Sequence, residues 1–259
     1  MMNKTVFLFA THKLTDFVLE QYYRLKLATK NIGVLYLLIE DGELQQIPVD
    51  VKYYSFSVDT LNELNYEPIE ESIIPGSNHF PVLQFYKEHP EFLYYWNIEY
   101  DVYFNGKWES FFDPFEMIIS DFISSHIEWY TQRPKWDWWK SVQFKTLSIP
   151  QNRYLKSFNP IYRISNRALK ALDGVLSLRN SGHHEVVIPT VLDYLGYTIN
   201  DFGGNSEFTL CELNIPCYLS NSELNNWYTE STMRYRPVFN KEAITRKGID
   251  NMLYHPIKF

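Results

Sequence analysis

The chain has 259 residues, a formal net charge of −7 and 45% hydrophobic residues. This length is enough to bury a substantial core, in one large α/β domain or in two small ones. The negative charge argues against general nucleic-acid binding, which needs a basic surface to displace counterions from phosphates. An anionic ligand would therefore need a local device, such as a metal ion or a helix N-terminus.

Cysteine count and hydropathy narrow the class of protein further. The two cysteines, Cys211 and Cys217, are too few for a disulfide scaffold or a four-ligand zinc site, and we expect both to be small buried hydrophobic residues. No segment of the sequence approaches the ~20 apolar residues that a membrane span needs. The apolar run at residues 6–10 is also too short for a signal peptide, so we expect no membrane span and a cytoplasmic location.

The N-terminal part of the chain predicts a βαβ unit. Val6–Ala10 and Val34–Ile39 are apolar runs of strand length, and between them Thr15 or Asp16 can cap a helix. Strand, helix and strand within about 35 residues imply a parallel pair of strands. The apolar face of the helix consists of Val18, Leu19, Tyr22 and Leu25. Further along we expect a strand at 51–57, a loop at 68–79, a helix at 80–88 and a long strand at 92–104.

The second part of the chain is less regular. Residues 117–124 predict a strand or a short helix, and Ser165 can cap a helix that buries Ala168, Leu169, Leu172, Val175 and Leu176. Another helix is expected at about 184–195, ended by Gly196. The tryptophan-rich segment 129–139 is poor core material, because several indole N–H groups would need partners. We interpret it as an ordered loop that lines or covers a site, with a structural clamp as the alternative.

Glu99 and Asp101 stand at the end of the predicted strand 92–104. Successive side chains of a strand alternate between its faces, so these two carboxylates point the same way. Acids at the end of a buried strand are costly unless they meet a metal, a donor or water, and the carboxyl ends of strands are where α/β sheets bind ligands. Carboxylate oxygens suit Mg²⁺ or Mn²⁺, which can also bind phosphate oxygens. The alternative is a pair of acids that faces solvent or pairs with Lys or Arg.

Two further groups carry possible chemistry. Glu185, within His183-His184-Glu185 at a helix start, can act as a general base, although the helix dipole is a sufficient structural reason for an acid there. His255 and Lys258 lie among apolar residues near the C-terminus, so the tail is expected to dock. A docked tail could supply a metal ligand and a phosphate contact, and an exposed, frayed end is the alternative. The sequence contains no GxGxxG, GxxxxGK[ST] or GxSxG motif.

Taken in order, these motifs resemble the GT-A-fold glycosyltransferases, and in particular poorly characterised members with a DXD-like motif. The resemblance rests on the apolar βαβ start, on Glu99-Tyr100-Asp101 within the phrase 96–102, on the helix start at 183–190, on Tyr162-Arg163-Ile164-Ser165 and on His255. It implies a Rossmann-related α/β fold, with a mixed, mostly parallel central sheet flanked by helices in a single domain, 1–259. The nucleotide-binding half would span about 1–104 and the acceptor-side half about 105–259.

The resemblance also implies an activity, namely metal-dependent and inverting transfer of a sugar from a UDP- or GDP-linked donor to a glycan or another hydroxyl acceptor. Asp101, Glu99 and His255 would hold Mn²⁺ or Mg²⁺, with Glu99 and Lys258 also contacting the nucleotide and its diphosphate. The remaining implied roles are Thr11 and His12 as nucleotide contacts, Glu185 as the base, and Trp136, Trp138 and Trp139 as sugar platforms. The first acid is Glu where the family's motif has Asp, which puts the role of Glu99 in doubt more than that of Asp101.

Two other classes of function fit the same residues. A glycoside hydrolase would use Glu99 and Asp101 or Glu185 as paired carboxylates, at ~5–10 Å separation and without a metal. A non-catalytic carbohydrate- or nucleotide-binding domain would keep the fold without turnover. Sensitivity to EDTA separates the transferase from the hydrolase.

Overall fold

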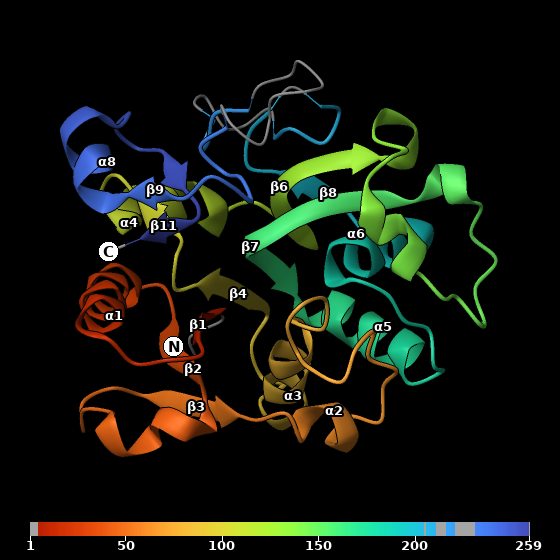
Figure 1. The fold of residues 1–259 in the computed structure, drawn as a ribbon, viewed down its shortest axis with the longest axis horizontal. Coiled ribbons are helices and arrows are strands. Elements are labelled where there is room, and N and C mark those ends of the chain that lie inside the picture. Colours follow the sequence, from red (N-terminus) through yellow and green to blue (C-terminus); the bar gives the residue numbers. More distant parts are fainter. Residues whose placement is uncertain (1–4, 205, 211–215, 221–230, 259) are drawn as a thin grey trace.

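The computed structural model of the protein describes residues 5–204, 206–210, 216–220 and 231–258, and it is built around a seven-stranded sheet (Figure 1). Across the sheet the strands are β3 (Tyr53–Phe56), β2 (Val34–Glu40), β1 (Thr5–Thr11), β4 (Tyr94–Glu99), β7 (Leu155–Ser165), β6 (Phe122–Trp129) and β8 (Ile199–Asp201). The first four run parallel, and β6 is parallel to β8. Only β7 is antiparallel to its neighbours, so the expected mixed, mostly parallel α/β sheet is confirmed.

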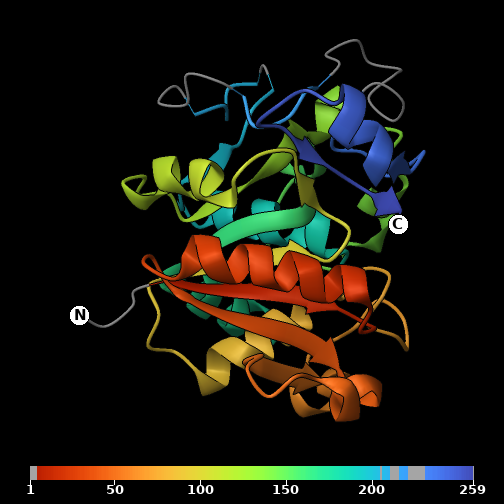
Figure 2. The same ribbon diagram turned by 90° about the vertical axis from the view of Figure 1, so that its left-hand side faces the viewer.

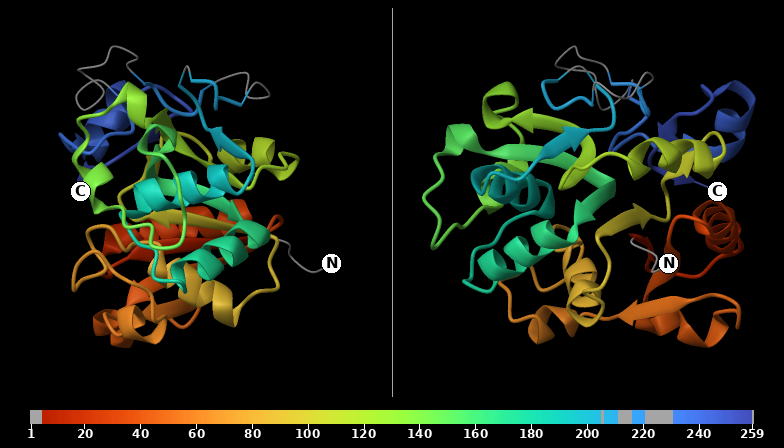
Figure 3. Two further views of the ribbon diagram at one scale, coloured as in Figure 1. Left: turned by 90° about the vertical axis from the view of Figure 1, so that its right-hand side faces the viewer. Right: turned by 180° about the vertical axis from the view of Figure 1, so that it is seen from behind.

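Helices cover both faces of this sheet. The α-helices are α1 (Asp16–Thr29), α2 (Thr60–Glu63), α3 (Phe80–Glu88), α4 (Trp108–Phe112), α5 (Asn166–Leu176), α6 (His184–Tyr194) and α8 (Lys241–Lys247). Helix α1 covers one face (Figure 2), and α5 and α6 cover the other (Figure 3). Phe7 and Phe9 of β1 belong to the core cluster that includes residues of α1 and α4, whereas Val6 and Leu8 belong to the cluster with residues of α3, α5 and α6. Because side chains alternate between the two faces of a strand, this one buried strand contributes to both cores.

Local signals place the ends of the main helices as the sequence predicts. Thr15 accepts a hydrogen bond from the backbone N–H of Val18 at the start of α1, and Ser165 accepts one from Ala168 at the start of α5. Gly196, at a φ of +78°, follows the end of α6 in the left-handed conformation that a glycine adopts most easily. The βαβ unit, the helix at 80–88 and the strand at 51–57 are confirmed, the last as the shorter β3.

The long strand expected at 92–104 is wrong. β4 ends at Glu99, the N–H of Tyr100 donates to Ala10 as the last contact with β1, and the N–H of Val102 then closes a turn on the carbonyl of Glu99. The next two residues form β5 (Tyr103–Phe104), which pairs with β10 (Leu253–Tyr254) outside the main sheet. Asp101 therefore lies in a turn and not on the face of a strand, because the chain leaves the sheet where its neighbour β1 ends.

The segments 117–124 and 129–139 contain little regular structure. Strand β6 starts only at Phe122, and the tryptophan-rich segment is an ordered loop with short 3₁₀ helices, as expected. Trp139 is buried, and its indole N–H donates to the carbonyl of Arg133 at 2.7 Å, so this ring holds the loop together. The 3₁₀ helices are η1 (Asp41–Gln46), η2 (Asp113–Glu116), η3 (Tyr130–Gln132), η4 (Asp137–Ser141) and η5 (Gln151–Arg153).

The C-terminal segment docks onto the N-terminal part of the chain, as predicted. It contains β9 (Phe239–Asn240), α8, β10 and β11 (Ile257–Lys258), and β11 pairs with β9 beside α1 (Figure 1). A separate apolar cluster fastens it and consists of Phe17, Tyr103, Ile244, Met252, Tyr254 and Ile257. Burial of these side chains stabilises the docked tail.

The structure bears on the expected burial of the cysteines and on the expected lack of a membrane span. Cys217 is a half-buried free thiol that packs against the core under α1, and Cys211 lies outside the described residues. None of the helices in the described ranges combines the length and the apolar composition that crossing a bilayer requires.

One buried cation ties the irregular segment 113–120 to the sheet. Arg163 of β7 is 3% exposed, its guanidinium donates to the carbonyls of Phe115, Ile118 and Ser120, and it stacks over the ring of Tyr94. We expect Arg163→Met to lower the free energy of unfolding by about 2–4 kcal/mol, because three carbonyls lose their donor. Urea denaturation measures this, with Arg246→Met on the exposed face of α8 as the control. A loss no larger than in the control would contradict the prediction.

Candidate active site

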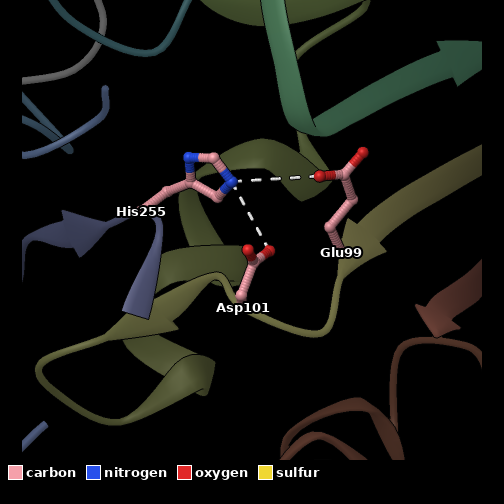
Figure 4. A group of neighbouring side chains, drawn as sticks. All are labelled: Glu99, Asp101 and His255. Carbon is pink, nitrogen blue, oxygen red and sulfur yellow. Dashed lines mark ion pairs between the residues drawn. The ribbon is translucent and has the colours of Figure 1, made fainter. Parts of the chain in front are cut away.

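Three side chains from distant parts of the sequence converge at the carboxyl end of the central strands (Figure 4). The Nε2 atom of His255 lies 3.4 Å from Oδ1 of Asp101 and 3.9 Å from Oε2 of Glu99. One ligand atom of each of the three residues lies within 4.8 Å of the others. Glu99 comes from the end of β4, Asp101 from the turn that follows, and His255 from the docked tail.

Backbone hydrogen bonds hold the tail in register with this turn. The N–H of Ile257 donates to the carbonyl of Asp101 at 3.0 Å, and the N–H of His255 donates to Thr232 at 2.9 Å. The Nδ1 atom of His255 lies 2.9 Å from the carbonyl of Arg234, so Nδ1 carries the proton. This hydrogen bond leaves Nε2 as the atom that faces the two acids, which is the arrangement of a metal-binding histidine.

The electrostatics of the three residues are strongly coupled. Burial, reinforced by the negative charge of Asp101, raises the pKa of Glu99 to about 7. Burial also acts against the charged forms of Asp101 and His255, but their mutual attraction prevails, lowering the pKa of Asp101 and raising that of His255. The single positive charge of the imidazolium thus compensates only part of the negative charge of two half-buried carboxylates.

The donor set fits a divalent cation. Two carboxylates and an imidazole suit Mn²⁺ or a similar ion that accepts both oxygen and nitrogen ligands. The Oδ1 atom of Asp101 is buried and accepts no hydrogen bond from the described residues, which leaves a ligand atom available. The carbonyl of Arg234 fixes the orientation of the imidazole ring. A candidate cation site therefore exists where the sequence places it, even though the strand that carries Glu99 ends before Asp101.

A pocket of about 590 Å³ opens beside this cluster, along the carboxyl ends of β1, β2 and β3. Its wall includes Thr11 and His12, both predicted nucleotide contacts, together with Glu99 and Asp101. The hydroxyl of Thr11 donates to the carbonyl of Lys13, and the exposed ring of His12 meets Tyr100 edge to face. Its apolar lining consists mainly of Ala10, Leu38, Phe56, Val58, Ile73, Ile74 and Pro81.

Glu185 lies in the first turn of α6, close enough for its charge to affect Glu99. Its Oε1 atom accepts from the backbone N–H of Asn159 at 3.3 Å. Burial raises the pKa of Glu185 to about 7, although the buried ammonium of Lys156 and the charge of His255 oppose this effect. The structure therefore brings the predicted base and the cation cluster into one electrostatic environment.

The tryptophan-rich loop lies beside Glu185 through His183. The ring of Trp138 stacks on His183 at 4.3 Å between centroids, and Trp136 meets the same imidazole edge-on. The Nδ1 atom of His183 accepts from the N–H of Glu185 and caps α6. Trp136 and Trp138 are half-buried, but Trp139 is only 3% exposed, so its faces are closed to a sugar and it acts as the clamp.

Lys258 is not brought into the cluster by any described contact. It is exposed on β11, one residue beyond the Ile257 amide that binds Asp101. Conversely, sequence reasoning missed Asn78, whose Nδ2 atom donates to Oε1 of Glu99 at 3.3 Å. It also missed Glu40 and Asn97, which line the pocket. The only signal for Asn78 was its place at the end of a loop rich in Pro, Gly and Ser.

His79, His183 and His184 form a buried group next to Glu185. The rings of His79 and His184 lie 6.2 Å apart and nearly parallel, and His183 adjoins His184 at 4.8 Å. Both ring nitrogens of His79 are buried without a hydrogen bond to the described residues. Burial lowers the pKa of His79 to about 3 and that of His184 well below its ordinary value. These rings are neutral in the folded protein.

Comparison with known proteins yields fold likeness only. No family model matches the chain, and no curated protein matches it in sequence. Among solved structures, the galactosyltransferase LgtC in complex with donor and acceptor sugar analogs is 8% identical, covering 76% of this chain and 73% of its own, with a TM-score of 0.43. A glycosyltransferase involved in glycosylation of the major capsid of PBCV-1 is 12% identical, covering 78% and 84%, with a TM-score of 0.39.

The matches are not restricted to sugar transfer. The inositol-1-phosphate CTP transferase from T. maritima is 12% identical, covering 82% of this chain and 92% of its own, with a TM-score of 0.42. At TM-scores below 0.5, these likenesses carry no inference about the ligand or the reaction.

The buried imidazole of His79 predicts a specific pH dependence of stability. Its pKa is about 3 in the folded state, against an ordinary histidine value of 6.5, so below pH 6.5 the unfolded chain binds the extra proton and stability falls. Between pH 7 and pH 5 this one group is expected to remove about 2 kcal/mol. In His79→Phe that part of the loss should vanish, as measured by urea unfolding at both pH values. The same pH dependence in both proteins would show that His79 is not buried as a neutral ring.

Proposed function

We propose that the protein is a metal-dependent glycosyltransferase that moves a sugar from a nucleotide diphosphate sugar to a hydroxyl acceptor. One observation carries the proposal: the cation cluster of Glu99, Asp101 and His255 lies at the edge of a pocket that runs along the carboxyl ends of β1, β2 and β3. A nucleotide in this pocket has its diphosphate at the cluster when its base lies toward β2 and β3. Such a pocket is where α/β sheets hold nucleotides.

The ion would be Mn²⁺ or Mg²⁺, and it would offset the negative charge that develops on the nucleoside diphosphate leaving group. Asp101 and His255 would hold it, with Glu99 as the third ligand. The proposal keeps Thr11 and His12 as nucleotide contacts, since both line the pocket. Lys258 remains a candidate for the diphosphate only if its exposed side chain turns toward Asp101.

Glu185 would act as the general base. Its carboxylate is held by the N–H of Asn159 and lies within electrostatic range of Glu99 and His255. An acceptor hydroxyl bound between Glu185 and the donor sugar would lose its proton to this carboxylate as it attacks, and the sugar would be transferred with inversion. A pKa of about 7 keeps a useful fraction of this base ionised at neutral pH.

The acceptor would enter from the side of the tryptophan-rich loop. Trp136 and Trp138 are half-buried and surround His183, the residue that caps the helix of Glu185. Aromatic rings in such a position stack against the apolar faces of sugars. In this proposal residues 1–104 form the nucleotide-binding half and residues 105–259 the acceptor-side half, with His255 crossing between them.

The cation requirement can be tested without knowing the acceptor. UDP and GDP are added with and without Mn²⁺, and the melting temperature is recorded. We expect one nucleotide to raise it only when Mn²⁺ is present, since about 2.7 kcal/mol of stabilisation is gained at a ligand concentration of 100 Kd. EDTA should reverse the shift and His255→Ala should abolish it, whereas His89→Ala, away from the cluster, should keep it. A nucleotide-induced shift that is indifferent to Mn²⁺ and to EDTA would refute the cation requirement.

The base role of Glu185 is tested with Glu185→Gln, which keeps the side-chain shape. We expect the transfer rate to fall by about 10²–10⁴ while Mn²⁺ and nucleotide binding persist. In the unmodified protein the rate should rise about tenfold per pH unit below pH 7 and level off above it, because only the ionised carboxylate accepts a proton. Glu242→Gln on the exposed face of α8 is the control. An unchanged rate in Glu185→Gln would refute the role, and product anomers retaining the donor configuration would explain why.

A further inference from the structure

The loop before α3 reaches the cation cluster through the side chain of Asn78. Its Nδ2 atom donates to Oε1 of Glu99 at 3.3 Å, while the other oxygen of that carboxylate, Oε2, lies 3.9 Å from His255 Nε2. The two carboxylate oxygens of Glu99 therefore have different neighbours. One is held by the amide, and the other is left for the ion that the cluster would bind.

The backbone around Asn78 is firmly held. The carbonyl of Gly76 accepts from the N–H of His184 at 2.9 Å, and the N–H of Ser77 donates to Ile73 at 2.8 Å. Gly76 has a φ of +94°, and a Cβ added there would clash with the side chain of Ile69. No other residue fits this position without displacement. The loop is thus fastened to the N-terminus of α6, the turn that carries Glu185.

The orientation of the amide follows from its surroundings. With the NH₂ group toward Glu99, the amide forms a hydrogen bond with a carboxylate that accepts only. The reverse orientation would place the amide oxygen against that carboxylate. The Oδ1 atom is buried and accepts no hydrogen bond from the described residues, so no competing partner there favours another rotamer. Carboxylates that ligate metals commonly depend on such outer hydrogen bonds.

Asn78 also belongs to the wall of the nucleotide pocket. Ser72, Ile73 and Ile74, on the same loop, line the pocket together with Asn78 and Glu99. A ligand bound against this part of the wall therefore contacts the loop whose Asn78 orients Glu99. The loop connects three parts of the site: the pocket, the cation cluster and the helix start of Glu185.

We propose that Asn78 is a positioning residue of the cation site, which orients Glu99 and links the ion to the wall of the nucleotide pocket. The inference rests on the proposed cation site, because it requires Glu99 to be a ligand. In this role Asn78 is neither a ligand of the ion nor a group that takes part in the reaction. It acts through the carboxylate of Glu99.

The test measures binding of Mn²⁺ alone, by titration calorimetry and by electron paramagnetic resonance of the free ion. Asn78→Ala is expected to weaken Mn²⁺ binding by about 10-fold, the lower end of the usual cost of losing an outer partner of a metal ligand. Asn78→Leu, which fills a similar space without a side-chain N–H, should weaken Mn²⁺ binding to a similar extent. It replaces the alanine variant in the test if that variant does not fold. Asn62→Ala, an exposed asparagine of α2, is the matched control and should bind Mn²⁺ as the unmodified protein does.

A double-mutant cycle separates positioning from a general structural effect. If Asn78 acts through Glu99, then Asn78→Ala introduced into Glu99→Gln changes the Mn²⁺ affinity by less than about twofold, because the side chain it orients has already lost its charge. A merely structural role would give the same loss in both backgrounds. That result overturns the inference.

The remaining outcomes are also decisive. If the unmodified protein binds Mn²⁺ and both Asn78 variants bind it equally well, Asn78 is not a positioning residue and the cation site stands. If the unmodified protein binds no Mn²⁺ but still binds UDP or GDP, the cation site itself is refuted, and this inference falls with it.

Discussion

The site depends on one long-range contact, the docking of the C-terminal segment against the turn that follows β4. The amide of Ile257 binds the carbonyl of Asp101, and this places the imidazole of His255 against two carboxylates. Without the imidazole, Glu99 and Asp101 would be two like charges, half-buried and close together, an arrangement that raises the pKa of at least one of them. The apolar cluster that holds the tail therefore also favours the ionised form of Asp101.

The sheet arranges the rest of the site around this contact. Parallel strands β1, β2, β3 and β4 end at one edge, so the pocket and the cation cluster adjoin each other. The antiparallel β7 supplies Lys156 and Asn159 from the neighbouring position, and both act on Glu185. The residues of the cation cluster and those around Glu185 thus come from different parts of the chain, yet they meet because β4 and β7 are hydrogen-bonded neighbours.

Much of the fold and part of the site could be predicted from the sequence. Apolar runs and caps locate β1, α1, β2, α3 and α5 because these signals are local. The sequence points to the three residues of the cation cluster, but strand β4 ends before Asp101, since the end of a strand depends on where its partner ends. Asn78 could not be found, because its meeting with Glu99 depends on how a loop packs. The expected role of Trp139 as a sugar platform does not fit its burial, because composition alone does not separate a buried indole from an exposed one.

The late position of His255 has a consequence for how the site forms. Residues of the βαβ unit are close in sequence, whereas Asp101 and His255 are separated by more than half of the chain. Closing so long a segment costs more entropy than forming local contacts, although the increase with length is slow. A partly folded molecule in which the sheet has formed and the tail is still undocked has two acids and no imidazole. Any undocking of the tail, during folding or in the native state, therefore separates the imidazole from the two acids and leaves the three-ligand cluster incomplete.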